Sequence, residues 1–313
     1  MSVSQEGHDA QEAIMKSLRR SLHFVPGGNE KMFIKATGLP ADSLILDLED
    51  AVTPENKADA RKRVCEWLAS TAWKGQEKLV RINPLESPWG REDIEAVMAV
   101  SPDGIVLPKI HDSAGVMAVD VLVTSLEREF ARVHGSTPLL LIGTEEAAAV
   151  FNLNHTLNHA RIEGVAWAAE DLSNALGAKA KRDDQGNYLE VFRYVRSLCL
   201  LAAIANGKQA IDGPFVDIRD RQGLEQECKL TSSMGYSGKL TIHPDQIDTV
   251  NRSFSPSDEE VSRARELVEA FASHQAEGRM AFAFNGEMVD VPHLKRAEAL
   301  LARAALIKQY DNR

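Results

Sequence analysis

The stretch Gly164-Val165-Ala166-Trp167-Ala168-Ala169-Glu170-Asp171 decides the fold that we predict for this chain. It begins as a short apolar run, which is typical of a buried strand. It ends in two adjacent acids, and a buried strand does not normally end in carboxylates unless they are paired, hydrated or coordinated. In folds that alternate strands and helices, the carboxyl ends of the strands carry the chemistry. We therefore interpret Asp171 as a metal ligand or an acid–base group.

Seven further apolar segments resemble this one, and helical patterns separate them. Strand–helix alternation at this count predicts an α/β fold, a parallel (β/α)8 TIM barrel. A doubly wound open sheet is the alternative, but no G-x-G-x-x-G follows the first segment to support it. The expected strands are residues 21–25, 43–46, 78–83, 104–107, 138–142, 164–167, 209–211 and 239–242.

The pattern changes after the eighth strand. Ser257 to Glu260 forms a capping box ahead of a helical repeat, and Asn285-Gly286 marks a turn in a short extended segment. A last amphipathic helix is expected at 293–308. We predict three parts, namely a partly helical N-terminal extension (1–17), the barrel (18–254) and a small C-terminal helical lid and oligomerisation domain (255–313).

Composition excludes several classes of protein. The formal net charge of -10, without a dominant cluster of Lys and Arg, argues against nucleic-acid binding but not against small anions. The three cysteines are scattered, which favours a reducing compartment. The first sixteen residues lack the features of a signal or transit peptide, and no apolar run approaches the ~20 residues of a membrane span. We expect a cytoplasmic protein with no membrane partner.

Charged side chains follow the predicted strands at the ends that would converge on one mouth of a barrel. Carboxylates without a cluster of His or Cys suit a hard cation, Mg²⁺ or alternatively Mn²⁺. An arginine opposite such a cation suits a carboxylate or an enolate oxygen, so the set suggests Lewis-acid chemistry on an oxyacid. The side chains are Glu49, Asp50, Arg81, Lys109, Glu145, Glu170, Asp171, Asp212 and His243.

Less specific roles are open for several of these residues. Arg81 would serve structure alone if it only paired with Glu49 or Asp50. For Lys109 and Asp212 a structural role is favoured over a catalytic one. Which of the adjacent acids Glu170 and Asp171 faces the site stays open, although a helix-capping Glu170 would leave Asp171 in the site. No Ser or Cys lies in a nucleophile-elbow context, so covalent catalysis is disfavoured.

Motifs along nearly the whole chain resemble the citrate lyase β-subunit-like family of the HpcH/HpaI aldolase superfamily, which includes malyl-CoA and citramalyl-CoA lyases. Each motif alone is weak, and together they are specific. They are Arg20 to Gly27 (RSLHFVPG), Leu46 to Val52 (LDLEDAV) with Lys57 and Arg61, Val80 to Asn83 (VRIN), Glu170 to Leu172 (EDL), Ile242 to Ile247 (IHPDQI) and Gly286 to Asp290 (GEMVD).

The resemblance implies a Mg²⁺-dependent barrel that forms a homotrimer or a dimer of trimers. Glu145 and Asp171 match its metal-binding acids, and Arg81 matches its substrate-contacting arginine. Asp290 matches a lid carboxylate that acts as acid and base in a neighbouring subunit. The positions that match residues binding substrate or CoA phosphates are Phe24, Lys31 and Lys57.

One motif departs from the family pattern. Many members read Ile-Glu-Thr at the fifth strand, whereas this chain reads Ile142-Gly143-Thr144-Glu145-Glu146. Alignment without a gap would put Gly143 at the metal position. We prefer Glu145, because a branch of the family carries Ala-Thr-Glu-Thr there.

These inferences predict a Claisen-type carbon–carbon lyase that acts on a 3-hydroxyacyl-CoA such as malyl-CoA or citramalyl-CoA. Its small-molecule partners would be an acyl-CoA and a 2-oxoacid, and its candidate catalytic residues are Arg81, Asp290, Glu49 and Asp50. One alternative is a class II aldolase acting on pyruvate-derived hydroxyacids without CoA. The other is a lyase-like subunit with a degenerate site.

Overall fold

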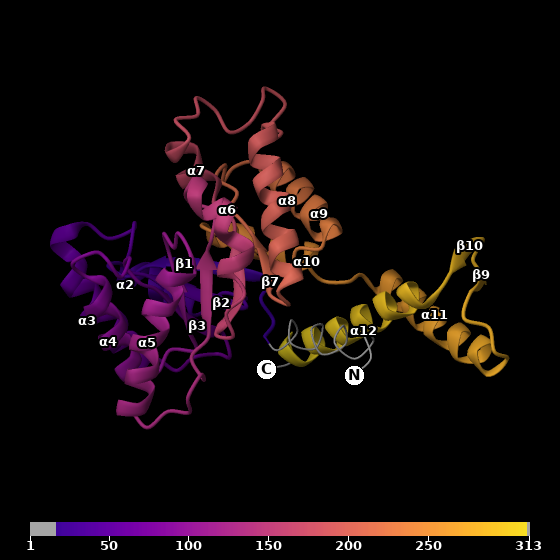
Figure 1. The fold of residues 1–313 in the computed structure, drawn as a ribbon, viewed down its shortest axis with the longest axis horizontal. Coiled ribbons are helices and arrows are strands. Elements are labelled where there is room, and N and C mark those ends of the chain that lie inside the picture. The colour runs from indigo at the N-terminus through magenta and orange to yellow at the C-terminus, as the bar shows by residue number, and fades with distance from the viewer. Residues whose placement is uncertain (1–16, 312–313) are drawn as a thin grey trace. The chain divides into compact units, whose positions relative to one another are not determined.

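The computed structural model describes residues 17–311, and its strands form a closed parallel barrel in chain order (Figure 1). This confirms the predicted (β/α)8 barrel. The predicted N-terminal extension lies almost wholly outside the described residues. The strands are β1 (Ser21–Pro26), β2 (Ser43–Asp47), β3 (Glu77–Arg81), β4 (Gly104–Leu107), β5 (Leu139–Ile142), β6 (Ile162–Ala166), β7 (Gln209–Asp212) and β8 (Gly238–Thr241).

Helices connect the strands and cover the outside of the barrel, as in other parallel sheets whose two faces are buried. Asp171 lies in the first turn of α7, beyond the end of β6, and the short turn η1 (Pro54–Asn56) precedes α3. The helices of this unit are α2 (Glu30–Ala36), α3 (Lys57–Ser70), α4 (Gly90–Ala99), α5 (Ser113–Glu129), α6 (Ala147–Thr156), α7 (Ala169–Ala175), α8 (Glu190–Ala205), α9 (Arg221–Met234), η2 (Pro244–Gln246) and α10 (Ile247–Ser253).

Alternation along the strands decides which side chains enter the barrel. Ile45 and Leu79 belong to the interior apolar cluster, so the side chains two residues further on, Asp47 and Arg81, also face inward. The register of β2 and β3 sets Asp47 directly opposite Arg81. The remaining members of the interior cluster are Leu22, Val106, Leu140, Ile142, Ala166, Ala168, Ile211 and Leu240, with Phe24 packed against them.

Asp212 faces outward, because Ile211 beside it points into the barrel. Its carboxylate is fully buried and accepts hydrogen bonds from Trp167 Nε1 (2.6 Å), from Arg196 Nε (3.0 Å) and from Lys239 Nζ (2.6 Å). Glu227 of α9 also pairs with Lys239, at 2.8 Å. Asp212 therefore ties β7 and β8 to their helices, which supports the structural role favoured for it, and its side chain does not point into the mouth.

The described residues divide into two compact units, the barrel Arg19–Asn251 and a part that begins at Arg252. In the second part, α11 (Asp258–Ala276) starts with the predicted capping box of Ser257 and Glu260. The strands β9 (Phe282–Phe284) and β10 (Glu287–Val289) pair antiparallel across Asn285-Gly286, and α12 (Val291–Asp311) follows. The assignment of 255–313 as a lid and oligomerisation domain stays a prediction.

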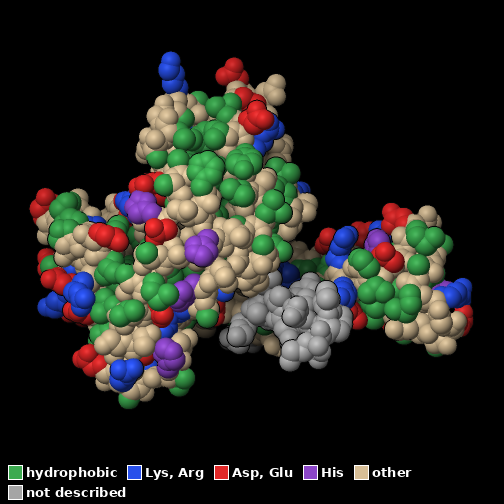
Figure 2. Space-filling view, viewed as in Figure 1, with side chains coloured by type: hydrophobic (Ala, Val, Ile, Leu, Met, Phe, Trp, Pro, Cys, Tyr) green, Lys and Arg blue, Asp and Glu red, His purple; other side chains and the backbone are tan. Residues whose placement is uncertain are grey.

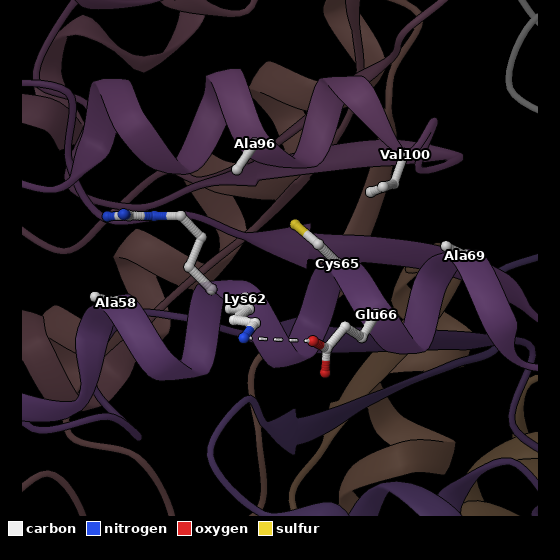
Figure 3. A pocket seen from close by; sticks show the side chains of 8 residues that line it. Ala58, Lys62, Cys65, Glu66, Ala69, Ala96 and Val100 are labelled. Carbon is white, nitrogen blue, oxygen red and sulfur yellow. Dashed lines mark ion pairs between the residues drawn. The ribbon is translucent and has the colours of Figure 1, made fainter.

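A groove of about 560 Å³ lies outside the barrel, between α3 and α4 (Figure 3). Small side chains line it, among them Ala58, Ala69 and Ala96, with Cys65 at its centre and the ion pair of Lys62 and Glu66 on one side. It lies on the face of the barrel wall opposite to the inward-facing charges. The groove is therefore separate from the charged side chains at the mouth of the barrel.

None of the helices between residues 17 and 311 combines the length and the apolar character that a membrane crossing needs. The cytoplasmic location stays a prediction.

A buried histidine makes stability depend on pH. His23 is 2% exposed, and its Nδ1 lies 3.0 Å from Thr241 Oγ1. Burial first, and then the nearby His243, lower the pKa of His23 from 6.5 to about 4. The unfolded chain takes up this proton at the higher pH, so the folded state keeps its full stability above about pH 6.5 and loses it as the pH falls towards 4.

We predict that His23→Asn flattens this dependence. Between pH 6.5 and 4.5, the unfolding free energy of the wild type should fall by about 2 kcal/mol more than that of the variant, since only the wild type carries this histidine. Urea unfolding at the two pH values measures the difference. Equal pH slopes would contradict the assignment.

Candidate active site

The mouth of the barrel is organised by Arg81 at the end of β3. Its Nε and Nη2 donate to the two oxygens of Asp47, both at 2.7 Å, which is a bidentate pair. Its Nη1 lies 2.9 Å from Glu49 Oε2, and Phe24 lies under the guanidinium at 4.8 Å. All of these side chains except Phe24 are at least nine-tenths buried. The guanidinium is therefore held in one position before any substrate arrives.

Asp47 is the functional residue that the sequence analysis missed. We assigned the partners of Arg81 as Glu49 or Asp50, whereas Asp47 makes the strongest contact. Asp50 is 52% exposed and lies 3.8 Å from Arg81. The sequence did contain a signal for this contact, because aligning the expected parallel strands at 43–46 and 78–83 would have set Asp47 opposite Arg81.

The loop after β2 is held in place by side chains that donate hydrogen bonds to its main-chain carbonyl oxygens. Lys57 Nζ donates to the carbonyl oxygens of Leu48 (2.8 Å) and Glu49 (2.7 Å), and Asn83 Nδ2 donates to Leu48 O (2.9 Å). Lys57 is 6% exposed, so its ammonium is already engaged inside the protein. This geometry supports a role of Lys57 in holding Glu49 in place. The predicted contact of Lys57 with CoA phosphates is not supported by this geometry and stays a prediction.

Glu145 follows β5 and turns into the mouth. It is 3% exposed, and one carboxylate oxygen accepts a hydrogen bond from the main-chain N–H of Lys109. The other oxygen, Oε1, is buried and has no hydrogen-bond partner. Burial first, and then the charges of Glu49 and Asp171, raise the pKa of Glu145 to about 8. A buried carboxylate with a free oxygen beside other carboxylates lacks a compensating cation.

Gly143 could not have been the metal ligand. A Cβ atom there would lie 2.7 Å from Val165 Cγ2 and 2.8 Å from Leu153 Cδ1, so its position faces packed side chains. Thr144 is also buried, and its Oγ1 accepts a hydrogen bond from Ala168 N at 2.8 Å. Glu146 is exposed. The preference for Glu145 in this segment is thus supported by the geometry.

The adjacent acids Glu170 and Asp171 have different partners in the structure. Glu170 pairs with Lys181, which lies in the segment after α7, while Asp171 is half-buried on the side of the mouth. Burial first, and then the charge of Asp50, raise the pKa of Asp171. Asp171 is therefore the acid available to a ligand, and Glu170 is held away from it by an ion pair that the sequence analysis did not foresee.

The site fits a divalent cation that keeps several waters. Glu145 and Asp171 offer carboxylate oxygens, which Mg²⁺ prefers, and Glu145 Oε1 awaits a partner. Between residues 17 and 311 no three Asp, Glu, His or Cys side chains group closely enough to enclose a metal by themselves. Two carboxylates are enough for Mg²⁺ when water and substrate oxygens fill the other positions.

The remaining predicted residues form no hydrogen bond or ion pair with Glu145 or Asp171 in the described part of the chain. Lys31 is exposed on α2, near a cavity of about 460 Å³ whose lining includes Gly28 and Arg63. Asp290 belongs to the second unit, between β10 and α12, where its Oδ1 lies 2.6 Å from His293 Nδ1 and its side chain is 51% exposed. His243 caps η2 through its side chain and is a satisfied end-of-strand histidine.

Comparison with known proteins agrees with this geometry. The model of the HpcH/HpaI aldolase/citrate lyase family matches residues 20–244. The chain is similar to "(3S)-malyl-CoA thioesterase" of Cereibacter sphaeroides, with 33% identity over 93% of this chain and 96% of that protein. It is also similar to "Citrate lyase subunit beta" of Leuconostoc mesenteroides, with 35% identity over 92% of this chain and 93% of that protein.

A solved structure supports the same fold. Protein CitE from Mycobacterium tuberculosis, in complex with magnesium, acetoacetate and coenzyme A, is similar to this chain with a TM-score of 0.76 and 33% identity. The match covers 92% of this chain and 98% of that one.

We predict that Glu145→Gln stabilises the metal-free protein and removes its response to Mg²⁺. At pH 8.5 the wild-type carboxylate is charged and uncompensated, so a neutral side chain should raise the melting temperature by roughly 3 °C. Added Mg²⁺ should stabilise the wild type and leave the variant unchanged. A calorimetric melt with and without Mg²⁺ measures both effects. Glu146→Gln is the matched control, and an equal Mg²⁺ response in Glu145→Gln would rule out this ligand.

Proposed function

We propose, from the premise that this chain belongs to the HpcH/HpaI aldolase/citrate lyase family, that it is a magnesium-dependent carbon–carbon lyase of the Claisen type. The family predicted from the motifs is confirmed by the match over residues 20–244. The observation that carries the proposal is the free, buried Oε1 of Glu145 next to Asp171 and the clamped Arg81. A divalent cation on Glu145 and Asp171, together with the fixed guanidinium of Arg81, would suit a substrate that carries two oxygen-containing groups.

The substrate that we propose is a 3-hydroxyacyl-CoA such as malyl-CoA or citramalyl-CoA. Relatives that share about a third of the residues carry the names malyl-CoA thioesterase and citrate lyase subunit beta, and protein CitE is seen with magnesium and coenzyme A. Glu145 and Asp171 would hold Mg²⁺, which would supply Lewis acidity to the oxygens of the 2-oxoacid half, and Mn²⁺ prefers the same ligands.

Arg81 would bind the thioester oxygen. As the 3-hydroxyl group loses its proton to solvent and becomes the carbonyl of the 2-oxoacid, the carbon–carbon bond breaks and its electron pair passes to the acyl-CoA fragment as an enolate, whose negative oxygen faces the guanidinium. Because Asp47 fixes the guanidinium on one side, little reorganisation is needed as the charge develops. Glu49 and Asp50 would balance the charge of Arg81 and Lys109 around the substrate.

Asp290 would complete the site from the lid of a neighbouring copy. Its exposed carboxylate would donate a proton to the enolate carbon during cleavage and remove it during condensation. Closure of the lid would exclude water and favour the lyase reaction over thioester hydrolysis. The cavity lined by Arg63 would offer a cation for the phosphates of CoA, Lys31 lies two residues beyond its lining residue Asn29, and Phe24 would contact the acyl end of the substrate.

The function is tested by a screen of acyl-CoA and 2-oxoacid pairs for Mg²⁺-dependent condensation. We expect a condensed 3-hydroxyacyl-CoA from at least one pair, such as acetyl-CoA with glyoxylate, and none after removal of Mg²⁺. Release of free CoA without accumulation of a condensed thioester would favour hydrolysis, the activity named for the Cereibacter relative. Condensation that needs no CoA would support the aldolase alternative. No Mg²⁺-dependent activity or stabilisation with any pair would support the degenerate-site subunit.

Asp290→Asn should abolish turnover and keep Mg²⁺ binding, because the amide cannot exchange the proton while Glu145 and Asp171 are intact. We expect a fall in kcat of at least about 100-fold with little change in the Mg²⁺-induced shift of melting temperature. Asp311→Asn, in the same unit, is the control. Unchanged turnover in Asp290→Asn would rule out its acid–base role.

An exposed apolar strip is our candidate surface for contact between copies. It runs over α6 and α8, which pack together, and consists of Phe151, Tyr194, Leu201 and Ile204. Figure 2 shows hydrophobic side chains gathered over these helices. Phe151 is 83% and Leu201 66% exposed. Such apolar patches are unusual on a monomer, and stable interfaces between identical chains are apolar at their centre.

We predict that Phe151→Glu with Leu201→Glu dissociates the homotrimer or dimer of trimers that the family resemblance implies. The buried charges should lower the mass seen in light scattering to that of one chain, with the barrel still folded by circular dichroism. The exposed pair Val133→Glu and Val121→Glu is the control. An unchanged mass would place the interface elsewhere.

A further inference from the structure

The mouth of the barrel holds more carboxylates than the proposed metal site needs. Three cations, Arg81, Lys109 and Lys57, lie near these carboxylates, so negative charge is still in excess. Mg²⁺ with two protein carboxylates keeps positions for water and substrate oxygens, whereas additional carboxylates would fill them. The site therefore requires an interaction that keeps some of these carboxylates from coordinating the metal. The five carboxylates are Asp47, Glu49, Asp50, Glu145 and Asp171.

Lys109, directly after β4, contacts three of these acids with two different groups. Its ammonium lies 2.6 Å from Glu49 Oε1 and 3.4 Å from Asp50 Oδ1. Its main-chain N–H donates to Glu145. The backbone at Lys109 has a positive φ of 53°, which a non-glycine residue rarely adopts. The side chain and the backbone of one residue thus act on different carboxylates.

Asp50 is the carboxylate that could most easily turn towards the metal. It is 52% exposed and its contact with Arg81 is long, at 3.8 Å, so Lys109 is its nearer cation. Asp50 also lies close enough to Asp171 for their charges to interact. Glu49, in contrast, is buried and is also held by Arg81 at 2.9 Å. Without the ammonium of Lys109, Asp50 would be free to turn towards a cation bound at Asp171.

We propose that Lys109 is a positioning residue that selects the metal ligands. Its ammonium withholds Glu49 and Asp50 from the metal, and its N–H directs Glu145 towards it. This inference rests on the proposed Mg²⁺ site of Glu145 and Asp171. It explains how a site rich in acids leaves coordination positions open for the substrate.

The test measures Mg²⁺ binding to the full chain by isothermal calorimetry, without substrate. Lys109→Met removes the ammonium and keeps the main-chain N–H. We expect Mg²⁺ to bind roughly threefold to tenfold more tightly, because a nearby positive charge is lost and Asp50 becomes a ligand. The KM for the 2-oxoacid should rise, since fewer positions are open to it. Unchanged or weaker Mg²⁺ binding would overturn the inference.

Asp50→Asn separates ligand selection from a simple loss of charge. Alone, it should change Mg²⁺ affinity less than twofold, because Asp50 is held by Lys109 in the wild type. In the double variant Lys109→Met, Asp50→Asn, most of the gain in affinity should disappear, which a double-mutant cycle reports as coupling. A full gain in the double variant would overturn the role of Lys109 in restraining Asp50. Lys109→Arg, which keeps the charge, should bind Mg²⁺ within about twofold of the wild type.

Two further variants distinguish failure of this inference from failure of the proposed site. Glu145→Gln and Asp171→Asn should each lose Mg²⁺ binding. If they bind like the wild type, the metal site itself is wrong and the inference falls with it. If they lose binding and Lys109→Met matches the wild type, only the role of Lys109 is wrong. Should Lys109→Met not fold, Lys109→Gln gives the same comparison, with circular dichroism as the check of folding.

Discussion

The bidentate pair between Arg81 and Asp47 is the interaction on which the rest of the site depends. It joins the ends of two adjacent strands inside the barrel, with both partners almost fully buried. Removing one partner of such a pair costs about 3–5 kcal/mol, because the other charge is left uncompensated. The pair also fixes where Glu49 meets the guanidinium, and through Glu49 it fixes Lys109. The cationic part of the mouth is thus rigid before substrate binds.

The carboxylate part of the mouth is arranged in the opposite way. Glu145 and Asp171 are buried or half-buried without a cation of their own, and Glu145 keeps one oxygen unpartnered. Uncompensated burial of this kind lowers stability, and proteins retain it where function requires it. The buried network around Asp212, in contrast, pairs its carboxylate with Arg196 and Lys239 and stabilises the barrel wall.

Two adjacent acids in the sequence have different environments in the fold. Lys181 lies ten positions beyond Asp171 and pairs with Glu170. The chain between them leaves α7 and returns to it, so the pair depends on the path of that segment. Similarly, Asp212 appeared to be one more strand-end acid, yet strand alternation turns it outward into ion pairs with Arg196 and Lys239. Position at a strand end is therefore not enough to place a side chain in the mouth.

Sequence patterns alone predicted the number and order of the strands, the capping box at Ser257 and the turn at Asn285-Gly286, and they offered Arg81, Glu145 and Asp171 as candidates for the site. These inferences depend on local periodicity, local turn chemistry and motifs, which a single chain displays directly. The folded structure was needed to show that Asp47 holds Arg81, that Lys57 binds backbone carbonyls and that Lys109 bridges Glu49 and Asp50. Those contacts join residues from different strands and loops, so they depend on strand register and side-chain direction, which closure of the barrel sets.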